Sequence, residues 1–455
     1  MELLLEDRVL GVALDICRRV RSAGGRGVFV GGVVRDTLLG RASKDCDIEV
    51  FGLAPARLKA VLAPAYGLDL VGESFGVLKV RGCPIDVSVP RRESKAGRGH
   101  KGFEIASDPA LTAEEAAARR DFTVNAMSYD PLDDVLIDPC GGRRDLAAGV
   151  LRHTSPKFVE DPLRVLRGMQ FAARFALTPA PDTVRLCRAI EPEGLAPERV
   201  FDEWRKLVLL GAAVSTGLAF LRDTGWVRYT PELAALIDCP QEPDWHPEGD
   251  VWVHTLHSMD AFAAERIGDD REDLVVGLAV LCHDFGKPAT TTFEDGRIRS
   301  RGHCEAGVEP TQRFLGRMTR QADLIRDVTV LVAEHLRPME LHGGNAGPSA
   351  IRRLARRVKR IDRLVRVARA DYGGRPGLDR EPFEAADWLL ERARELEIAD
   401  AAPAPIVMGR HLIEMGLTPG PAFGPILEAC YEAQLGGDIA TLEEGLDLAR
   451  RLARG

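Results

Sequence analysis

The sequence predicts an α+β fold class, with a mixed amino-terminal region followed by two all-helical regions. Strand-like runs rich in Val, Ile and Phe are confined to about the first 90 residues, in GVFV, CDIEVFG, FGVLKVRG and PIDVSVP. From about residue 145 onward Leu, Ala and Arg dominate, and their spacing is that of helices. Strands that precede helices along the chain are typical of an α+β protein.

Changes in composition predict the domain boundaries. Apolar residues at helical spacing predict a first helix over residues 8–22, and GVFVGGVVRD then predicts a buried strand, a glycine turn and the start of a helix. Residues 237–250 are rich in Pro, Asp and Glu, which predicts a linker. We therefore expect a head at 1–145, a helical neck at 146–236, this linker, a second helical domain at 251–375 and a helical tail at 376–455.

The composition sets limits on location and partners. The chain has 455 residues, a formal net charge of -8 and a pI of about 5.8, so any nucleic-acid surface must be a local cluster. Nine scattered cysteines without C-x-x-C spacing predict reduced thiols. The start MELLLEDRVL lacks the regions of a signal peptide, and no apolar run has membrane-spanning length. We expect a cytoplasmic protein, neither secreted nor membrane-spanning.

A pair of carboxylates marks the first candidate site. Asp45 and Asp47 lie two residues apart in KDCDIEVFG, and in a strand such residues point to the same side. Two carboxylates on one face can hold Mg²⁺, as phosphoryl transfer with two metal ions requires, and Asp86 in PIDVSVP is the candidate third carboxylate. Glycines ahead of Arg35 allow backbone N–H groups to approach a triphosphate.

The D-x-D pair alone is more often a solvated strand end, but five motifs occur in a specific order. They are GGVVRDTLLG, KDCDIEV, RRDFTVNAMSYD, IDPCGGRRDL and EDPLRVLRGMQFAARF. Over residues 28–175 this order resembles the class II tRNA nucleotidyltransferase and bacterial poly(A) polymerase family, within the polymerase-β-like superfamily. The resemblance implies a nucleotidyltransferase head and a helical neck.

The resemblance also implies roles for particular residues. Asp45 and Asp47 are the Mg²⁺ ligands, and Gly32 and Arg35 contact the incoming nucleotide. Four residues of RRDFTVNAM grip the sugar and the triphosphate: Arg119, Arg120, Asp121 and Asn125. In the E-D-x-x-R run, Asp161 and Arg164 serve as a protein template for the base, and Arg167 is a second candidate.

The template role has a physical basis and a simpler alternative. On one helix, Asp161 and Arg164 would be neighbours because they are three residues apart. An arginine donates and a carboxylate accepts hydrogen bonds, so the pair can complement the polar edge of cytosine or, after a small reorientation, of adenine. The alternative is an ordinary surface ion pair at i,i+3 spacing.

Histidines and aspartates downstream of the expected linker form a second candidate site. Imidazole and carboxylate groups suit divalent first-row metals. The candidate ligands are His254, His283, Asp284 and Asp371, with His303 and His335 as further candidates. Any single histidine is more often structural. The order H…HD…D, with Lys287 completing HDFGK, resembles the HD phosphohydrolase superfamily, and His303 and His335 stand where its two-metal members carry extra ligands.

Basic residues gather in two further places. Residues 91–101 hold Arg91, Arg92, Lys95, Arg98 and Lys101, and the segment resembles the flexible loop of the family. Between residues 351 and 369, an apolar stripe of Ile351, Leu354, Val358, Ile361 and Val365 runs beside five cations, which predicts one helix with a basic face. The cations are Arg352, Arg356, Lys359, Arg363 and Arg366. A solvated arginine face is the alternative to RNA contact there.

Together the motifs predict an enzyme that adds CCA to the 3′ end of tRNA, using CTP, ATP and Mg²⁺. In the Gram-negative type of CCA-adding enzyme, an HD domain follows the head and neck and is associated with phosphatase and 2′,3′-cyclic phosphodiesterase activities. The resemblance implies Ni²⁺, Co²⁺ or Mn²⁺ for that domain. We expect the acceptor arm of tRNA as partner, no membrane, and a monomer or homodimer.

Three other functions remain open from the sequence. A poly(A) polymerase shares the head motifs, although this chain ends in the alternating-charge run TLEEGLDLARRLARG and not in a strongly basic extension. Partial enzymes that add only CC or only A share the same motifs. An HD phosphohydrolase whose head only binds RNA is the fourth reading, and the intact Asp45, Asp47 and E-D-x-x-R run argue against it.

Overall fold

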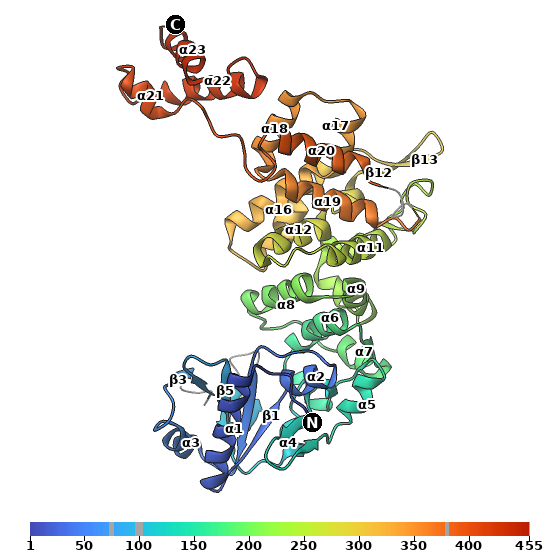
Figure 1. Cartoon of the computed structure of the whole chain (residues 1–455). Coiled ribbons are helices and arrows are strands. Elements are labelled where there is room, and N and C mark those ends of the chain that lie inside the picture. Colours follow the sequence, from blue (N-terminus) through green and yellow to red (C-terminus); the bar gives the residue numbers. More distant parts are fainter. Residues whose placement is uncertain (72–76, 96–102, 378–381, 455) are drawn as a thin grey trace. The chain divides into compact units, whose positions relative to one another are not determined.

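The computed structural model describes residues 1–71, 77–95, 103–377 and 382–454, with the backbone alone for 71, 92–95 and 103–107. The chain forms two compact units, Met1–Tyr229 and Thr230–Gly455 (Figure 1). The finer division into five parts stays a prediction. No helix in the described ranges is both long and apolar enough to cross a membrane. Arg98 and Lys101 of the expected basic loop lie outside the described residues.

A seven-stranded sheet organises the first unit, in the order β3-β4-β5-β2-β1-β8-β9. Its strands are β1 (Arg26–Val30), β2 (Cys46–Phe51), β3 (Leu68–Val71), β4 (Val77–Val80), β5 (Ile85–Ser88), β8 (Ser128–Asp130) and β9 (Val135–Ile137). All four strand-like runs of the sequence therefore belong to this sheet. Among the described strands of this sheet, β2 and β5 are the one pair that runs in parallel, and their register sets Asp47 beside Asp86. Strands β6 (Arg91–Lys95) and β7 (Phe103–Ser107) form a separate antiparallel pair.

Helix α1 (Asp7–Ser22) confirms the first helix that the sequence predicts. Its apolar residues recur every three or four positions, so they share one face, which packs against β1 and β2. The buried positions are Val9, Ala13, Ile16, Cys17 and Val20. Helix α3 (Pro55–Leu62) packs against α1. This layer covers the sheet and fixes the strands that carry the carboxylates.

A glycine turn leads from β1 into helix α2 (Gly32–Leu38). Gly31 has a φ of 69°, which favours glycine, and a Cβ added there would lie 3.4 Å from Arg120 Nη1. The turn therefore brings the start of α2 close to a motif nearly 90 residues away. The remaining elements of this region are α4 (Ala113–Ala117), η2 (Thr123–Asn125), α5 (Gly142–Ala147), β10 (Val150–Leu151) and η3 (Pro156–Glu160).

The helical neck is built around α6 (Leu163–Phe175), which packs against α8 (Pro197–Leu210) and α9 (Val214–Asp223). Glycines allow the close packing: a Cβ at Gly168 would lie 2.7 Å from the Phe220 ring, and one at Gly217 would lie 2.6 Å from Met169 O. Strand β11 (Thr178–Pro179), α7 (Pro181–Arg188) and η4 (Trp226–Tyr229) complete the first unit.

Four helices form the centre of the second unit: α11 (Val251–Ala264), α12 (Asp270–Cys282), α16 (Ala322–Glu334) and α19 (Ile361–Gly373) (Figure 1). Shorter elements join them: α10 (Pro231–Ala234), α13 (Lys287–Thr290), α14 (His303–Ala306), α15 (Val308–Gly316) and α17 (Arg337–Gly343). A hairpin of β12 (Thr291–Glu294) and β13 (Arg297–Ser300) is an addition to the all-helical expectation. Its turn residues Asp295 and Gly296 both have positive φ, as a tight hairpin turn requires.

The single basic helix expected between residues 351 and 369 is wrong. The chain forms α18 (Pro348–Val358) and α19, and Lys359 between them has a φ of 61°, so the helix cannot continue. The apolar stripe is buried as expected. Several of its arginines are neutralised by acidic partners. Arg356 pairs with Glu428 and Glu432, and Arg363 pairs with Glu272. The basic face is therefore weaker than the sequence suggests.

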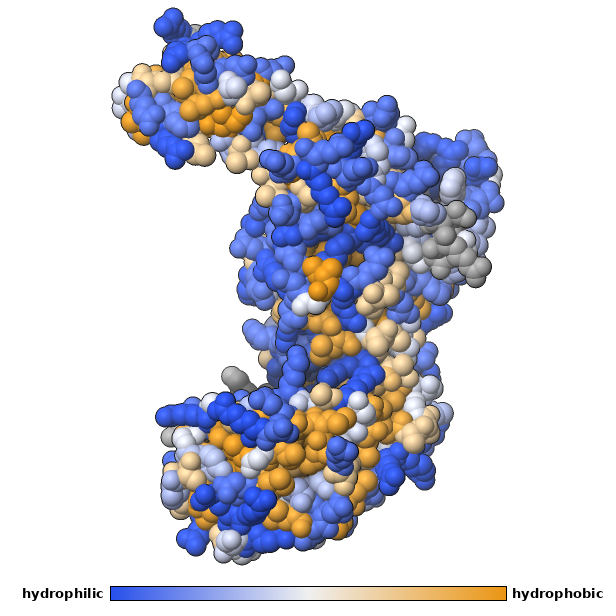
Figure 2. All heavy atoms as spheres, viewed as in Figure 1, coloured by the Kyte–Doolittle hydropathy of each residue, from blue (hydrophilic) through white to orange (hydrophobic). Residues whose placement is uncertain are grey.

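The carboxyl-terminal residues form four further helices: α20 (Glu384–Glu395), α21 (Gly409–Glu414), α22 (Phe423–Gly436) and α23 (Leu442–Arg454). The last three share a small core that includes Leu412, Cys430 and Ala449. Apolar side chains also reach the surface in this part, as Figure 2 shows, and Ile413 is among them. A core of this size contributes little burial, so these helices depend on one another for stability.

Candidate functional site

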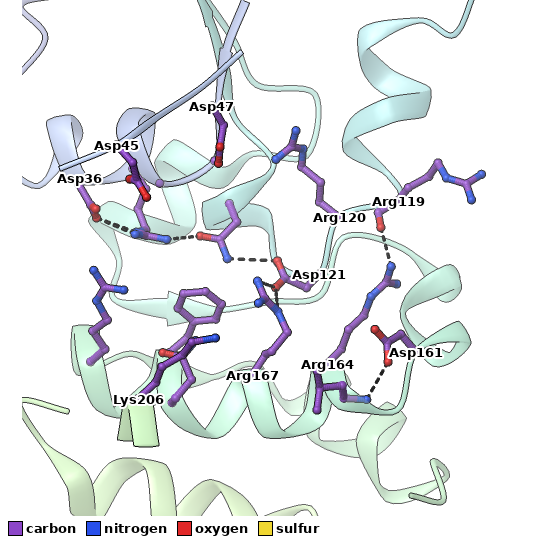
Figure 3. A pocket seen from close by; sticks show the side chains of 18 of the residues that line it. Asp36, Asp45, Asp47, Arg119, Arg120, Asp121, Asp161, Arg164, Arg167 and Lys206 are labelled. Carbon is purple, nitrogen blue, oxygen red and sulfur yellow. Dashed lines mark hydrogen bonds and ion pairs between the residues drawn. The ribbon is translucent and has the colours of Figure 1, made fainter. Parts of the chain in front are cut away.

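The first unit contains a pocket of about 590 Å³ between the sheet and the neck helices (Figure 3). The carboxylates Asp45 and Asp47 lie at one end, and Asp161 and Arg164 lie at the other. Of the head and neck site residues that the sequence predicts, only Asp86 is missing from its lining. The lining includes Gly32, Arg35, Asp45, Asp47, Arg119, Arg120, Asp121, Asn125, Asp161, Arg164 and Arg167. Motifs more than 100 residues apart thus meet in one cavity.

The acidic end depends on the pairing of two strands. Asp45 directly precedes β2 and Asp47 lies on it, and both line the pocket. Asp86 lies beside Asp47 on β5, with its carboxylate 3.4 Å from Lys79 Nζ. Loss of water and the charges of Asp45 and Asp86 raise the pKa of Asp47 to about 6. A divalent cation fits this cluster, because it would relieve the repulsion among carboxylates that suit hard cations.

A chain of hydrogen bonds crosses the pocket floor. Arg35 lies 2.8 Å from Asp36 and donates to Asn125 Oδ1 at 2.5 Å, and Asn125 donates to Asp121 at 3.1 Å. Asp121 then accepts from Arg167 of α6 at 2.6 Å. Burial alone would raise the pKa of Asp121, but Arg167 and Asn125 outweigh it and hold the pKa below its usual range. The polar side chains of the first and third motifs are therefore fixed by one another and by Arg167 of the neck.

The two residues expected to act as a template do not lie on one helix. Asp161 has extended backbone angles and precedes α6, because the following Pro162 disfavours a helical conformation for it. Its carboxylate accepts from the backbone N–H of Leu163 at 3.0 Å and from Arg199 at 3.1 Å. Arg164 lies on α6. The expectation of a shared helix is therefore corrected.

The alternative of a simple Asp161–Arg164 ion pair also fails within the described ranges. The Arg164 guanidinium instead donates to two backbone carbonyls, Lys157 O at 2.8 Å and Arg119 O at 2.7 Å. Arg164 is buried at 9% exposure. These bonds tie the E-D-x-x-R run of the neck to the RRDFTVNAM motif of the head.

Several lining residues were not anticipated. Gln170, Phe171 and Arg174 follow Arg167 on α6 by three, four and seven positions, so helical spacing from Arg167 could have identified them. Arg199 and Lys206 come from α8, and no motif marks them. Together with them the lining holds eight cationic side chains against five carboxylates, an excess of positive charge that suits a polyphosphate.

The IDPCGGRRDL motif supports the pocket from behind. Asp145 is buried and accepts from Thr123 Oγ1 at 2.8 Å and from Arg152 at 3.0 Å. Gly142 packs so closely that an added Cβ would lie 2.1 Å from Thr123 O. This motif therefore positions the segment that carries Asp121 and Asn125, and it does not line the cavity.

All six histidines and aspartates predicted for the second unit gather at one buried centre. His254 comes from α11, His303 from α14 and Asp371 from α19, while His283 and His335 directly follow α12 and α16. His254 Nε2 lies 3.0 Å from Asp371 Oδ1, and His283 Nε2 lies 3.2 Å from Asp284 Oδ2. On the other side, His303 Nε2 lies 3.6 Å from Asp284 Oδ1 and 3.3 Å from His335 Nε2.

Hydrogen bonds behind the histidines orient their rings. The Nδ1 atoms of His283, His303 and His335 each lie 2.7 Å from a backbone carbonyl oxygen. A carbonyl only accepts, so each Nδ1 carries a proton, and in the neutral imidazole each Nε2 presents a lone pair to the centre. His254 Nδ1 lies 2.8 Å from Glu248, which holds its ring in the same way.

This donor set fits a divalent metal. His283 Nε2 and Asp284 Oδ1 are buried and form no hydrogen bond in the described part of the chain. Burial alone would raise the pKa of Asp371, but Arg375 and His254 hold it well below its usual value. Lys287 Nζ, 2.7 Å from Asp284 Oδ2, also favours the ionised carboxylate. Buried ionised carboxylates that face imidazole lone pairs are the ligands that first-row metals prefer.

A cavity of about 400 Å³ adjoins this centre. Lys287 and Arg375 supply positive charge to its lining, and Trp245 contributes an aromatic ring that is 60% exposed. His246 and Glu248 come from the segment expected to be a linker, and neither is among the site residues predicted from the sequence. The composition of that segment is typical of a loop, so no motif indicated a functional residue there. The cavity suits a phosphate ester with an apolar group.

Each of the two units contains a segment that matches a known protein family. Residues 28–152 match the family described as the Poly A polymerase head domain, and residues 251–367 match the HD domain family. The Multifunctional CCA protein of Xylella fastidiosa (strain 9a5c) is 37% identical over 366 residues, which cover 77% of this chain and 84% of the relative. That of Xanthomonas campestris pv. campestris (strain B100) is 38% identical over 419 residues, with coverages of 90% and 97%.

Solved structures show the same fold. A Bacillus stearothermophilus CCA-adding enzyme in complex with CTP has a TM-score of 0.66 at 23% identity and covers 98% of each chain. A Thermotoga maritima CCA-adding enzyme complexed with tRNA_CCA has a TM-score of 0.59 at 21% identity and covers 99% of each. The fold and the pocket define a nucleotidyltransferase with a polymerase-type head and an HD unit. The chain belongs to the multifunctional CCA protein family.

Proposed function

We propose that this chain adds CCA to the 3′ end of tRNA, using CTP and ATP. The observation that carries the proposal is the single pocket that combines the Asp45–Asp47 pair, a positively charged middle and the Asp161–Arg164 region. The relatives named Multifunctional CCA protein support it. The solved neighbours hold CTP and tRNA, which are the substrates that we propose here.

Asp45 and Asp47, with Asp86 beside them, would hold Mg²⁺ at the acidic end of the pocket. When bound, Mg²⁺ supplies activation of the attacking 3′-hydroxyl and neutralises charge on the leaving pyrophosphate. The position of Asp86 one strand away, paired to Lys79, suits a supporting ligand. The tRNA terminus would therefore enter at this end.

The triphosphate and sugar would lie along the middle of the pocket. Gly32 at the start of α2 allows close backbone approach, and Arg35, Arg119 and Arg120 offer charge-assisted hydrogen bonds to phosphate oxygens. Asp121 and Asn125 hold Arg35 and Arg167 in place. These bonds hold the two arginines in fixed orientations, which lowers the ordering cost of binding a polyphosphate.

The base would lie at the Asp161–Arg164 end. Two residues there offer both kinds of hydrogen bond, since Asp161 accepts and Arg164 donates, and Arg167 is a second donor nearby. The two backbone carbonyls that Arg164 holds fix its guanidinium plane. A fixed donor pattern selects one base edge over another. The hydrogen bond from Arg199 would set the orientation of the Asp161 carboxylate, which is the acceptor for the base.

A second activity is favoured by the buried centre of the HD unit. We propose that His254, His283, Asp284 and Asp371 hold a divalent transition metal such as Ni²⁺, Co²⁺ or Mn²⁺, with His303 and His335 beside them. When bound, such a metal supplies Lewis-acid activation of water for phosphate-ester hydrolysis. Lys287 and Arg375 would bind the phosphate of a 2′,3′-cyclic or terminal phosphate ester.

The test of the main proposal is incubation with tRNA lacking its 3′ end and with labelled CTP, ATP or both. Addition of two C residues with CTP alone, then one A with both nucleotides, is the expected result. A long A tract would favour a poly(A) polymerase, and arrest after CC or addition of A alone would favour a partial enzyme. No addition, with phosphate-ester hydrolysis retained, would leave the HD activity as the only function. Cytoplasmic location and a monomeric or dimeric state stay predictions.

A further inference from the structure

Two histidines at one side of the HD centre, His303 and His335, direct their Nε2 atoms at each other. His303 and His335 both donate from Nδ1 to backbone carbonyls, so both Nε2 atoms present lone pairs. These two atoms face each other at 3.3 Å. Two lone pairs repel at that distance unless a proton or a cation lies between them.

A third donor lies at the same place. Cys304 Sγ is 3.8 Å from His303 Nε2, and ligand atoms of His303, Cys304 and His335 all lie within 4.8 Å of one another. Cys304 is buried at 9% exposure and forms no disulfide. On the opposite side Asp284 Oδ1 lies 3.6 Å from His303 Nε2. Two nitrogens and one sulfur therefore lie close enough together to share one metal ion, and a carboxylate oxygen lies beside His303.

The His303–His335 and His303–Cys304 spacings match those of a tetrahedral metal site. Two imidazole nitrogens bound to one Zn²⁺ at about 2.0–2.1 Å are roughly 3.3–3.4 Å apart, and a sulfur at about 2.3 Å lies roughly 3.6 Å from each. The distances between the donors, 3.3 Å and 3.8 Å, agree to within a few tenths of an ångström.

We propose that His303, Cys304 and His335 form a thiolate-containing metal position that prefers Zn²⁺ to Mg²⁺ or Mn²⁺. It rests on the proposed metal centre of the HD unit and adds a sulfur ligand to it. Asp284 lies between the two positions, because its Oδ2 faces His283 and its Oδ1 faces His303. Soft thiolate and imidazole ligands select Zn²⁺ or Co²⁺ over hard cations.

Binding of the metal ion to Cys304 would release one proton. The Cys304 S–H bond breaks, the proton leaves to solvent and the sulfur–metal bond forms, with no change of oxidation state. A cavity of about 470 Å³ reaches Cys304, and Arg299, Arg301 and Arg337 contribute to its lining. It offers the entry path that such a site needs.

The experiment is titration of the metal-free full-length protein with Co²⁺, followed by its absorption spectrum. We expect a thiolate-to-Co²⁺ charge-transfer band in the near ultraviolet, which Zn²⁺ removes by competition. The band should be lost in Cys304→Ser and Cys304→Ala and kept in Cys140→Ser, a matched control because Cys140 is a half-buried thiol of the first unit. Zn²⁺ affinity at this position should fall at least about 10-fold in both Cys304 variants.

A second measurement does not depend on any variant. In the parent protein, alkylation of Cys304 followed by peptide mass spectrometry should be slowed by Zn²⁺ and not by Mg²⁺. Co²⁺ binding without the band, a band that persists in Cys304→Ser, or alkylation that ignores Zn²⁺ would each overturn the sulfur ligand while leaving the HD centre standing. Failure of the HD unit to bind any divalent metal would overturn both the sulfur ligand and the proposed metal centre. Nucleotide addition is measured separately, because it tests the pocket of the first unit.

Discussion

The Asp121 carboxylate lies 2.6 Å from the Arg167 guanidinium, and this ion pair joins the RRDFTVNAM motif of the head to helix α6 of the neck. The exposed fractions of the two side chains are 8% for Asp121 and 33% for Arg167, so water screens the pair only in part. Asp121 also accepts a hydrogen bond from Asn125, which in turn accepts one from Arg35. One connected network of ion pairs and hydrogen bonds therefore holds the shape of the pocket.

Arg167→Ala should lower the free energy of unfolding of the first unit by about 2 kcal/mol, because it leaves the buried Asp121 carboxylate without its main partner. Thermal or urea unfolding measures the loss. Arg185→Ala on α7, whose arginine pairs with Asp182 at the surface, is the matched control and should change stability by less than about 0.5 kcal/mol. Equal effects of both substitutions would argue against the role of the pair.

Asp47→Ala or Asp45→Ala should reduce nucleotide addition by roughly 1000-fold, or about 4 kcal/mol of transition-state stabilisation, because each removes a proposed Mg²⁺ ligand. The melting temperature should change little, because each substitution also removes repulsion among Asp45, Asp47 and Asp86. Asp69→Ala, an exposed carboxylate on β3 paired to Arg81, should retain full activity. Addition rates that survive in either pocket variant contradict the assignment.

Arg164→Ala should weaken discrimination among nucleotides more than it slows addition. In the proposed site the guanidinium, fixed by two backbone carbonyls, would present its donors to the base, whereas the proposed Mg²⁺ ligands Asp45 and Asp47 lie at the other end of the pocket. Competition among CTP, ATP, GTP and UTP measures the selectivity. If Arg164→Ala still adds C and then A as cleanly as Arg185→Ala, the base is read elsewhere.

The double variant His283→Ala with Asp284→Ala should lose metal-dependent hydrolysis of 2′,3′-cyclic phosphates yet keep nucleotide addition within roughly tenfold of the parent. The two candidate sites lie in separate compact units, so their chemistry should be separable. Both activities are measured on one preparation, with Ni²⁺, Co²⁺ or Mn²⁺ for hydrolysis and Mg²⁺ for addition. Hydrolysis that persists, or that is absent from the parent, would return these histidines to a structural role.

Glu248→Gln should weaken Co²⁺ or Mn²⁺ binding to the HD centre by about 10- to 100-fold, because Glu248 orients His254 through Nδ1 and increases its basicity. Calorimetric titration of the metal-free protein gives the affinity. Glu395→Gln, an exposed glutamate at the end of α20 that pairs with Arg392, is the control. An unchanged affinity would mean that the ring of His254 is held by packing alone.

The sequence by itself determined the order of the parts and the identity of most lining residues. Motifs such as KDCDIEV are local, and a strand places Asp45 and Asp47 on one side whatever the rest of the chain does. Helical spacing likewise predicted α1 and the buried stripe of α18 and α19. The Asp-Gly turn of the β12–β13 hairpin was a local signal too, and it was overlooked.

Only the tertiary structure decided which side chains meet across long separations. Asp161 lies before α6 and not on it, because Pro162 follows it. In the packed structure Asp161 accepts a hydrogen bond from Arg199, and Arg164 donates to two backbone carbonyls. Glu248 lies in a segment with the composition of a linker, yet packing places it behind His254. Local spacing fixes the direction of a side chain along its own element, but its partner depends on how elements pack, which no single segment encodes.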